Sequence, residues 1–275
     1  MIKKISAGDQ GVPDGEGAEM SFFDHLEELR WHIVKSIIAI LIFAVVVYIF
    51  ESWVFENIIF AHKNEKFITY DIFQRLGVDF APSDFQIIQT EMAEQFFTSL
   101  KVSFWIGFVV AFPYVFYQFW SFIKPGLYED EAKAAKGVVF VCSFLFAIGV
   151  AFGFIVLAPF AIKFLSGYSV GIAVENSTSL KSYVGYLTNF TIPTGIIFQM
   201  PLLVYFLAKV GLLTDQFMRT YRKHSLVIIF ILAAMITPPD PMTMFLIGVP
   251  LYGLYEVSIF IAKRTTRKRE KELNS

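Results

Sequence analysis

Apolar stretches without a charged side chain alternate with charged segments along the chain. Six of these stretches are candidate membrane spans: residues 36–50, 102–123, 137–162, 182–208, 224–239 and 241–255. A helix needs roughly 20 mostly apolar residues to cross the hydrocarbon core of a bilayer. The second, third and fourth stretches reach that length, the first reaches it with its apolar flanks, and the last two are short. The pattern predicts an all-α polytopic membrane protein with six transmembrane helices, of which spans 5 and 6 are short.

The composition supports a membrane protein and excludes several other classes. Of the 275 residues, 56% are hydrophobic and 17% are charged, whereas about a quarter of a soluble domain is charged. This balance excludes a disordered chain and argues against an ordinary water-soluble enzyme. The net charge of −1 gives no support for binding to nucleic acid. Cys142 is the single cysteine, which excludes an intrachain disulfide and a cysteine metal cluster.

Lysine and arginine are concentrated on one side of the predicted spans. They gather in both tails and in the loops after spans 2 and 4, whereas the opposite loops hold fewer in longer segments. Because such residues accumulate on the cytoplasmic side, we expect cytoplasmic termini and a location in the cell (inner or plasma) membrane. We predict a flexible cytoplasmic tail over residues 1–20, a six-span domain over 21–264 and a basic cytoplasmic tail over 265–275. Residues 1–20 lack the apolar core of a cleavable signal peptide.

Residues 21–33, just before span 1, have the spacing of an amphipathic helix. Apolar residues recur at helical intervals along one face: Phe22, Leu26, Leu29 and Ile33. The other flank carries Glu27, Glu28 and Arg30. These charges mark either a solvated helix start or a site at the membrane boundary, and the spacing alone favours the solvated face.

Residues 119–133 end span 2 and continue into the next inner loop. Pro125-Gly126 is a helix-stop signal, and Glu129, Asp130 and Glu131 then place three carboxylates in a short loop. The cluster is either a charge bias at the start of span 3 or a binding site. The residues alone leave both alternatives open.

Three further features have structural interpretations. Residues 58–60 and 91–100, in the first outer loop, are predicted to form short amphipathic helices. Gly149 and Gly153 form a G-x-x-x-G pattern that is typical of close helix packing. His25 and His32 have no third ligand nearby, so we predict no metal site.

Three groups of motifs occur in order along the chain. The first is His25-Leu26-Glu27-Glu28-Leu29-Arg30, before span 1. The second is Pro113-Tyr114, Tyr117-Gln118, Trp120, Phe122, Pro125, Leu127-Tyr128 and Glu131. The third is Thr237-Pro238-Pro239-Asp240, then Pro250 and Tyr255-Glu256. Together they resemble the motifs of the TatC family, the polytopic subunit of the twin-arginine (Sec-independent) protein translocase, over residues 21–264.

The resemblance implies a function in protein export. Members of this family are receptor and core subunits that bind the Arg-Arg signal peptides of folded proteins at the cytoplasmic face. They work with TatA-type and TatB-type single-span partners, form homo-oligomers within a larger complex, and use the proton-motive force. The resemblance thus implies a protein in contact with membrane lipid, without enzymatic activity, cofactor or nucleic acid. The sequence likewise contains no G-x-x-x-x-G-K-[ST] phosphate loop.

The resemblance also implies a binding site. Glu28 and Glu131 match the family's two signal-contacting glutamates, and a carboxylate can receive a guanidinium through two hydrogen bonds. We assign Arg30 to positioning the acidic site and Phe122 to its apolar wall, because both match family positions at this site. The other motif residues are assigned structural roles: Leu29, Pro113, Pro125, Leu127, Tyr128, Pro238, Pro239, Asp240 and Glu256. Of these, Glu256 is close enough in sequence to Lys263-Arg264 to pair with them or to reach the membrane interface.

One position departs from the family's pattern. Where the family often has a glutamate in span 4, this chain has Gln199, which can form hydrogen bonds but cannot titrate. An amide in mid-membrane is costly without a partner, so we expect Gln199 to face the protein or a partner. A helix–helix hydrogen bond and a direct functional role both stay open.

Two other functions are weaker alternatives. A secondary transporter for a small solute needs charged residues near mid-membrane, and spans 2–4 contain none. An intramembrane enzyme needs a nucleophile with a base or a metal set inside the spans, and Cys142 has no histidine near it in sequence. A translocase receptor subunit is therefore the leading prediction.

Overall fold

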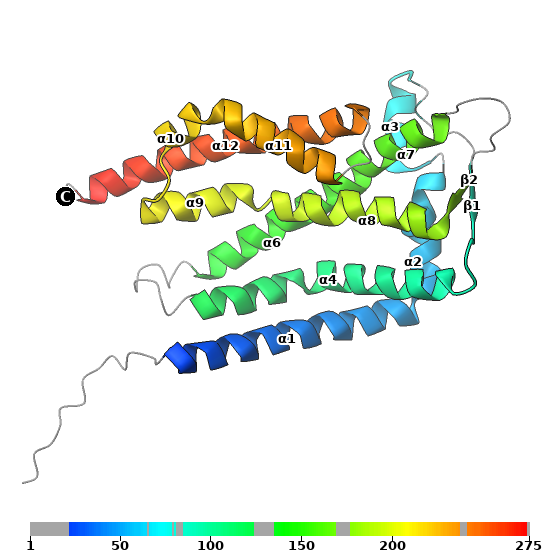
Figure 1. Ribbon diagram of the computed structural model, residues 1–275, viewed down its shortest axis with the longest axis horizontal. Coiled ribbons are helices and arrows are strands. Elements are labelled where there is room, and N and C mark those ends of the chain that lie inside the picture. Colours follow the sequence, from blue (N-terminus) through cyan, green and yellow to red (C-terminus); the bar gives the residue numbers. More distant parts are fainter. Residues whose placement is uncertain are drawn as a thin grey trace, which may run out of the picture.

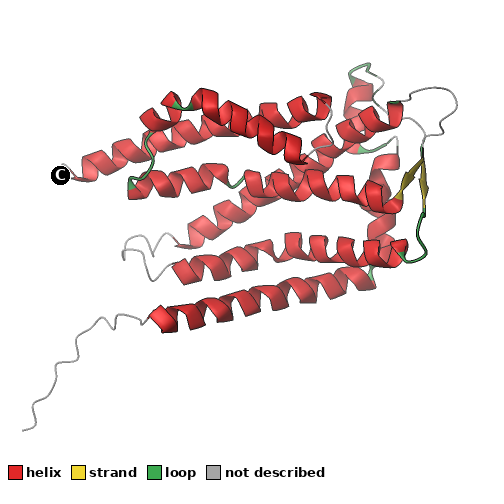
Figure 2. Ribbon diagram, in the orientation of Figure 1, coloured by secondary structure: helices red, strands yellow, loops and turns green. Residues whose placement is uncertain are grey.

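The computed structural model describes residues 22–64, 66–78, 80, 85–123, 135–168, 177–236 and 241–273. Long helices run side by side, and short helices and two strands lie at one end of them (Figures 1 and 2). The elements are α1 (Phe22–Ile49), α2 (Glu51–Asn57), the 3₁₀ segment η1 (Ile59–Lys63), α3 (Ile68–Arg75), β1 (Gln86–Ile88), α4 (Glu94–Ile123), α6 (Ala135–Phe152), the π-helical η3 (Gly153–Leu157), α7 (Ala158–Gly167), β2 (Ser177–Ser179), α8 (Leu180–Ile197), α9 (Met200–Val210), α10 (Asp215–Thr220), α11 (Arg222–Ile236) and α12 (Pro241–Leu273). The described chain is mostly helical, which confirms the all-α class.

Five segments of the described chain are long and apolar enough to cross a membrane: α1, α4, α6 with η3 and α7, α8 with α9, and α12. The fifth predicted span, α11, has only 15 residues, or about 22 Å of helix, and is short as predicted. The sixth was also predicted to be short, but α12 is a helix of 33 residues. It includes residues 265–273, which we predicted as a tail. Lysine, arginine and glutamate favour helix, and they extend α12 beyond its apolar part.

The helix α1 forms one edge of the bundle and packs mainly against α4 (Figure 1). Gly107 of α4 allows this close approach, because a Cβ there would lie 2.6 Å from the backbone nitrogen of Ala44. Next to α4 lie α6 and α8, and α9 and α11 both pack against α12. Because α1 has one main neighbour, no side chain between His25 and Ile49 is fully buried. Its apolar surface is therefore left to contact lipid.

The short helices α2 and α3, the segment η1 and the two strands gather at the end of the bundle away from the start of α1, whereas the short α10 lies at the opposite end (Figure 1). Strand β1 pairs with β2 in parallel, with Gln86 opposite Ser177, and this pairing joins two loops that are distant in sequence. The predicted helix at residues 58–60 corresponds to η1. The prediction of a separate helix over residues 91–100 is wrong, because Glu94 already begins α4, which continues without a break.

A π-helical turn interrupts the third span, and residues of the first outer loop form hydrogen bonds with it. A π-turn shifts the backbone hydrogen bonds and leaves carbonyl groups available to other donors. The fully buried His62 donates from Nε2 to the carbonyl oxygen of Phe154 at 2.9 Å. The hydroxyl of Thr69 donates to the carbonyl oxygen of Ile155. Burial lowers the pKa of His62 and so favours the neutral ring.

The predicted close packing at Gly149 and Gly153 is confirmed. A Cβ on Gly149 would lie 2.8 Å from the Cα of Gly195, and a Cβ on Gly153 would lie 2.4 Å from the carbonyl oxygen of Phe190. Both contacts are between the third span and α8. Only glycine allows the two backbones to approach so closely.

We expect Gly153→Ala to lower the free energy of unfolding by about 1–3 kcal/mol, because the methyl group overpacks a rigid backbone contact. Gly185→Ala in α8 is the matched control, since no atom lies within 4 Å of its added Cβ. That control should be neutral or stabilising, because alanine favours helix over glycine. Denaturation in mixed detergent micelles measures both changes. Equal effects of the two variants would show that the close contact does not limit packing.

Candidate functional site

Glu28 lies where the first turns of α1 pack against the last turns of α4. Its Oε1 is 3.8 Å from Nε2 of His32, one helical turn further along α1. Its Oε2 is buried and has no hydrogen-bond partner among the described residues. An unsatisfied carboxylate oxygen in a buried position is costly. This oxygen therefore has an unused acceptor position with respect to the described residues.

Phe122 of α4 contacts two histidines that precede and follow Glu28 on α1. The ring of His25 stacks on Phe122 with 4.3 Å between the ring centroids. The ring of His32 meets Phe122 edge-on at 6.3 Å. Since the two histidines lie on either side of Glu28 along α1, Phe122 and the Glu28 carboxylate share one small region.

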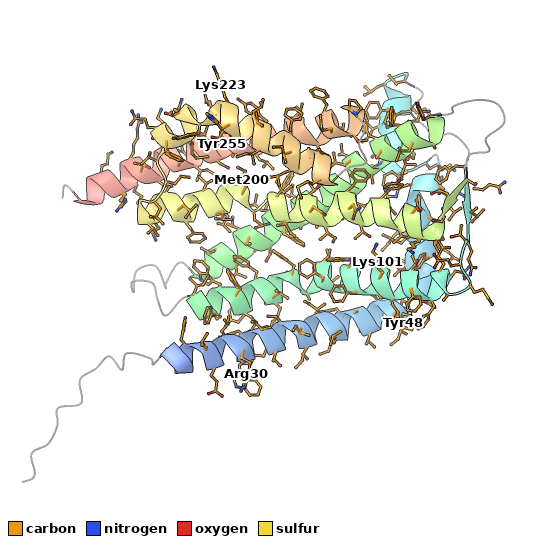
Figure 3. The ribbon with its side chains drawn as sticks, viewed as in Figure 1. Arg30, Tyr48, Lys101, Met200, Lys223 and Tyr255 are labelled. Carbon is orange, nitrogen blue, oxygen red and sulfur yellow. The ribbon has the colours of Figure 1, made fainter. Side chains whose placement is uncertain are left out.

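Arg30 is not brought to this region. Its guanidinium pairs with Glu27 at 3.2 Å, and 65% of its side chain is exposed. It also lies 5.8 Å from the ring of Trp31. Figure 3 shows Arg30 on the outer side of α1, away from the other helices. Arg30 therefore has no direct contact with Glu28 through which to position it.

Several predicted residues lie outside the described residues: Glu131, Pro125, Leu127, Tyr128, Pro238, Pro239 and Asp240. The described chain still constrains where the Glu131 segment is attached. Ile123 ends α4 and Ala135 begins α6, and both lie at the end of the bundle where α1 begins (Figure 1). The described residues on either side of this segment thus lie at the end that holds Glu28.

His32 and Gln118 are site residues that the sequence analysis missed. Nδ1 of His32 and Oε1 of Gln118 are hydrogen-bonded at 2.6 Å. Gln118, on α4, is buried at 6% exposure. The position of His32 four residues after Glu28 places the two on one helix face and is a signal that could have found it. Nothing in the sequence pattern pairs α1 with Gln118.

An apolar cavity of about 700 Å³ extends from this site into the bundle. His25 and Phe122 line it near the helix ends, whereas Cys142 and Gln199 line it in the middle of the spans. Most of the remaining wall is aromatic or aliphatic: Phe116, Phe119, Trp120, Ile123, Leu202, Leu203, Phe206, Leu207 and Val210. The cavity is suited to an apolar segment rather than to a charged solute.

Gln199 lies at the break between α8 and α9 and hydrogen-bonds to α6. In one orientation of its amide, the Cys142 thiol donates to Oε1 at 2.8 Å. In the other, Nε2 donates to the Cys142 carbonyl oxygen at 3.3 Å, and Oε1 accepts from the Phe146 backbone N–H at 2.9 Å. We adopt the second orientation because it satisfies both ends of the amide. The helix–helix hydrogen bond, one of the two alternatives, is thus present.

We expect Gln199→Leu to lower the free energy of unfolding by about 1 kcal/mol, the usual contribution of a polar bond between membrane helices. Cys142→Ala is the matched control, because it removes the thiol and keeps the backbone partners of Gln199. Unfolding in mixed micelles should therefore leave Cys142→Ala close to the parent protein. If Cys142→Ala lowers the free energy of unfolding as much as Gln199→Leu does, the stabilising hydrogen bond is the one from the Cys142 thiol to Gln199.

The predicted partner of Glu256 is wrong. Its Oε2 pairs with Nη2 of Arg222 at 2.6 Å, and its Oε1 accepts from the Tyr252 hydroxyl at 3.1 Å. The pair joins α11 to α12, whose contact the sequence does not reveal. Of the other motif residues, Leu29 is half-buried on α1, and Pro113 lies on the exposed side of α4 without ending it.

The fold and the site define a polytopic helical membrane protein with an acidic and aromatic site at one end of its bundle. Residues 24–250 match the sequence profile described as TatC, Sec-independent protein translocase protein. The chain belongs to the TatC family. It is therefore a multi-pass membrane subunit of protein transport and not a member of a known enzyme family.

Individual relatives and solved structures agree with this assignment. The Sec-independent protein translocase protein TatC of Blattabacterium sp. subsp. Periplaneta americana is 35% identical, over 92% of this chain and 99% of the relative. The TatC protein of Helicobacter pylori strain 26695 is 36% identical, over 87% and 86%. A crystal structure described as the twin arginine translocase receptor TatC matches with a TM-score of 0.69 and 33% identity, over 88% of this chain and 99% of that one. A second, in DDM, has a TM-score of 0.70.

Proposed function

We propose that this chain is the receptor and core subunit of the twin-arginine translocase. It binds the Arg-Arg signal peptides of folded proteins at the cytoplasmic face. With TatA-type and TatB-type partners, in a homo-oligomeric complex, it exports these proteins by means of the proton-motive force. The observation that carries the proposal is the buried Oε2 of Glu28, which has no partner in the described chain and belongs to the same stretch of α1 whose histidines contact Phe122.

The chemistry of Glu28 fits a signal arginine. A guanidinium stays charged and donates two parallel hydrogen bonds to a carboxylate. Among the described residues, Oε2 of Glu28 has no hydrogen-bond partner, and Oε1 faces Nε2 of His32 at 3.8 Å, beyond hydrogen-bonding distance. A lysine would lose the two-pronged geometry, which gives a reason for selectivity towards arginine.

The second arginine of the signal is assigned to Glu131. The segment that carries Glu131 joins α4 to α6 at the end of the bundle where Glu28 lies. The apolar segment of the signal then occupies the cavity that begins at His25 and Phe122. In this arrangement, Phe122 separates the charged part of the site from the apolar part.

The distribution of charge supports the proposed orientation. The end that holds Glu28 also carries basic residues of several helices: Arg219, Arg222, Lys223, Lys263, Arg264 and Arg267. Figure 3 shows Lys223 near this end, on the side of the bundle opposite Arg30. Because lysine and arginine accumulate on the cytoplasmic side, we assign this end and both termini to the cytoplasm.

A peptide-binding experiment tests the proposal. The protein, in lipid nanodiscs, is titrated with a fluorescent peptide that carries Arg-Arg before an apolar segment, and with its Lys-Lys counterpart. We expect the Lys-Lys peptide to bind at least about tenfold more weakly, since it loses the bidentate hydrogen bonds. Glu131→Ala should remove most of this preference. Equal binding of the two peptides to the parent protein would contradict the proposal and would favour a function such as solute transport.

A further inference from the structure

His32 lies between Glu28 and Gln118, and its two ring nitrogens have different neighbours. We assign the ring proton to Nδ1, because its 2.6 Å hydrogen bond joins it to Oε1 of Gln118, which can only accept. Nε2 therefore carries the lone pair of the neutral ring, and this atom is the one that faces Oε1 of Glu28 at 3.8 Å. Protonation of the ring adds its proton at Nε2, on the side of the carboxylate.

We propose that His32 is a positioning residue for Glu28 and makes arginine binding sensitive to pH. The proposal rests on the proposed function of Glu28. With a neutral ring, the lone pair of Nε2 offers no hydrogen bond to Glu28, and both carboxylate oxygens are available to a guanidinium. With a protonated ring, the Nε2–H and its positive charge pair with Glu28 and compete with the signal arginine.

The surroundings of His32 leave Glu28 as its nearest titratable neighbour in the described chain. Helix α4 presents the uncharged Gln118 and Phe122 to the ring. The charged residues of α4, Glu94 and Lys101, lie near its other end, as do Glu51 and Glu56 of α2. On α1 itself, Lys35 is exposed one turn away, and His25 shares Phe122 with His32. The experiment must therefore distinguish the effect of protonating His32 from that of protonating His25. Residues 124–134 lie outside the described residues.

Two anchors hold the His32 ring in this place. The hydrogen bond to the buried Gln118 fixes Nδ1, and the edge contact with Phe122 fixes the ring plane. Only 15% of the His32 side chain is exposed. A ring fixed in this way cannot turn away from Glu28 when it gains a proton, so its charge acts on the carboxylate directly.

The test measures the affinity of the Arg-Arg peptide, made without side chains that titrate between about pH 6 and pH 8, a range in which histidines change charge. In nanodiscs, we expect the parent protein to bind about tenfold more weakly at the acidic end, the effect of losing one charge-assisted interaction. His32→Gln keeps a side chain that can hydrogen-bond to Gln118 but cannot be protonated. Its affinity for the Arg-Arg peptide should show no pH dependence over this range.

Two controls separate the possible outcomes. His25→Gln should keep the pH dependence, and His32→Asn repeats the test if His32→Gln does not fold. A pH dependence that persists in both His32 variants, or that disappears only in His25→Gln, would overturn the assignment. If the His32 variants bind the Arg-Arg peptide more weakly than the parent protein by the same factor at every pH, His32 has only a structural role. If the parent protein does not distinguish Arg-Arg from Lys-Lys even at the alkaline end, the proposed function itself fails.

Discussion

Replacing Glu28 with alanine is expected to weaken binding of an Arg-Arg signal peptide by about a hundredfold and to abolish export of its cargo. The carboxylate is assigned two hydrogen bonds to one guanidinium, and each charge-assisted bond is worth roughly 1.5–3 kcal/mol. Loss of both corresponds to at least about two powers of ten in Kd. Peptide titration in nanodiscs measures the affinity, and transport into vesicles with TatA-type and TatB-type partners measures export.

Glu27→Ala is the matched control for this prediction. Glu27 precedes Glu28 on α1, but 64% of its side chain is exposed and it pairs with Arg30 on the outer side. A solvent-exposed ion pair of this kind contributes little. We expect Glu27→Ala to bind and to export like the parent protein. If both alanine variants lose binding equally, a general negative charge at this end, rather than the Glu28 carboxylate, attracts the signal.

The largest loss of stability is expected for Glu94→Ala, at about 3 kcal/mol or more. The Glu94 carboxylate is almost fully buried and accepts four hydrogen bonds, three of them from backbone N–H groups. Two of these N–H groups belong to Thr90 and Glu91, just before α4, and the third belongs to Lys181 at the start of α8. Each hydrogen bond to a charged group contributes roughly 1.5–3 kcal/mol, and Glu94→Ala removes all four. The free energy of unfolding in mixed micelles gives the size of the loss.

Glu91→Ala provides the comparison for Glu94→Ala. Glu91 also faces Lys181, but through an exposed ion pair of 3.5 Å. Its removal should change the free energy of unfolding by less than about 0.5 kcal/mol. A Glu94→Ala variant as stable as Glu91→Ala would mean that water replaces the carboxylate at no cost and that Glu94 does not join the two helices.

The membrane spans could be predicted from the sequence because they depend on local composition. Long uncharged stretches are sufficient to indicate α4, the third span and α8 with α9, and the short α11 followed from the same pattern. The full length of α12 was not predicted, because we took the end of its apolar residues as the end of the helix. Helix propensity continues through the basic residues to Leu273, although hydropathy does not.

Contacts between distant elements could not be predicted in the same way. For Glu256, the sequence offered pairing with its basic neighbours as one of two alternatives, whereas its partner Arg222 comes from α11. The bond from Lys181 to Glu94 joins residues 87 positions apart. Such pairings depend on which helices pack together, and a single amphipathic pattern does not contain that information.

The candidate site was predicted in part. The resemblance pointed to Glu28 and Phe122, and the structure places them in one region. Arg30 was assigned to the same site, but two residues along a helix from Glu28 it lies on a different face. His32 and Gln118 were missed because their importance arises only from the packing of α1 against α4.

The most direct test of the central claim is photo-crosslinking from within the site. A photoreactive amino acid replaces Phe122 in one variant and the exposed Trp31, on the outer side of α1, in another. We expect a labelled Arg-Arg signal peptide to crosslink at position 122 and not at position 31. An excess of unlabelled Arg-Arg peptide, but not of its Lys-Lys counterpart, should suppress the product. Equal crosslinking at the two positions, or suppression by both competitors alike, would contradict an arginine-specific site at Glu28 and Phe122.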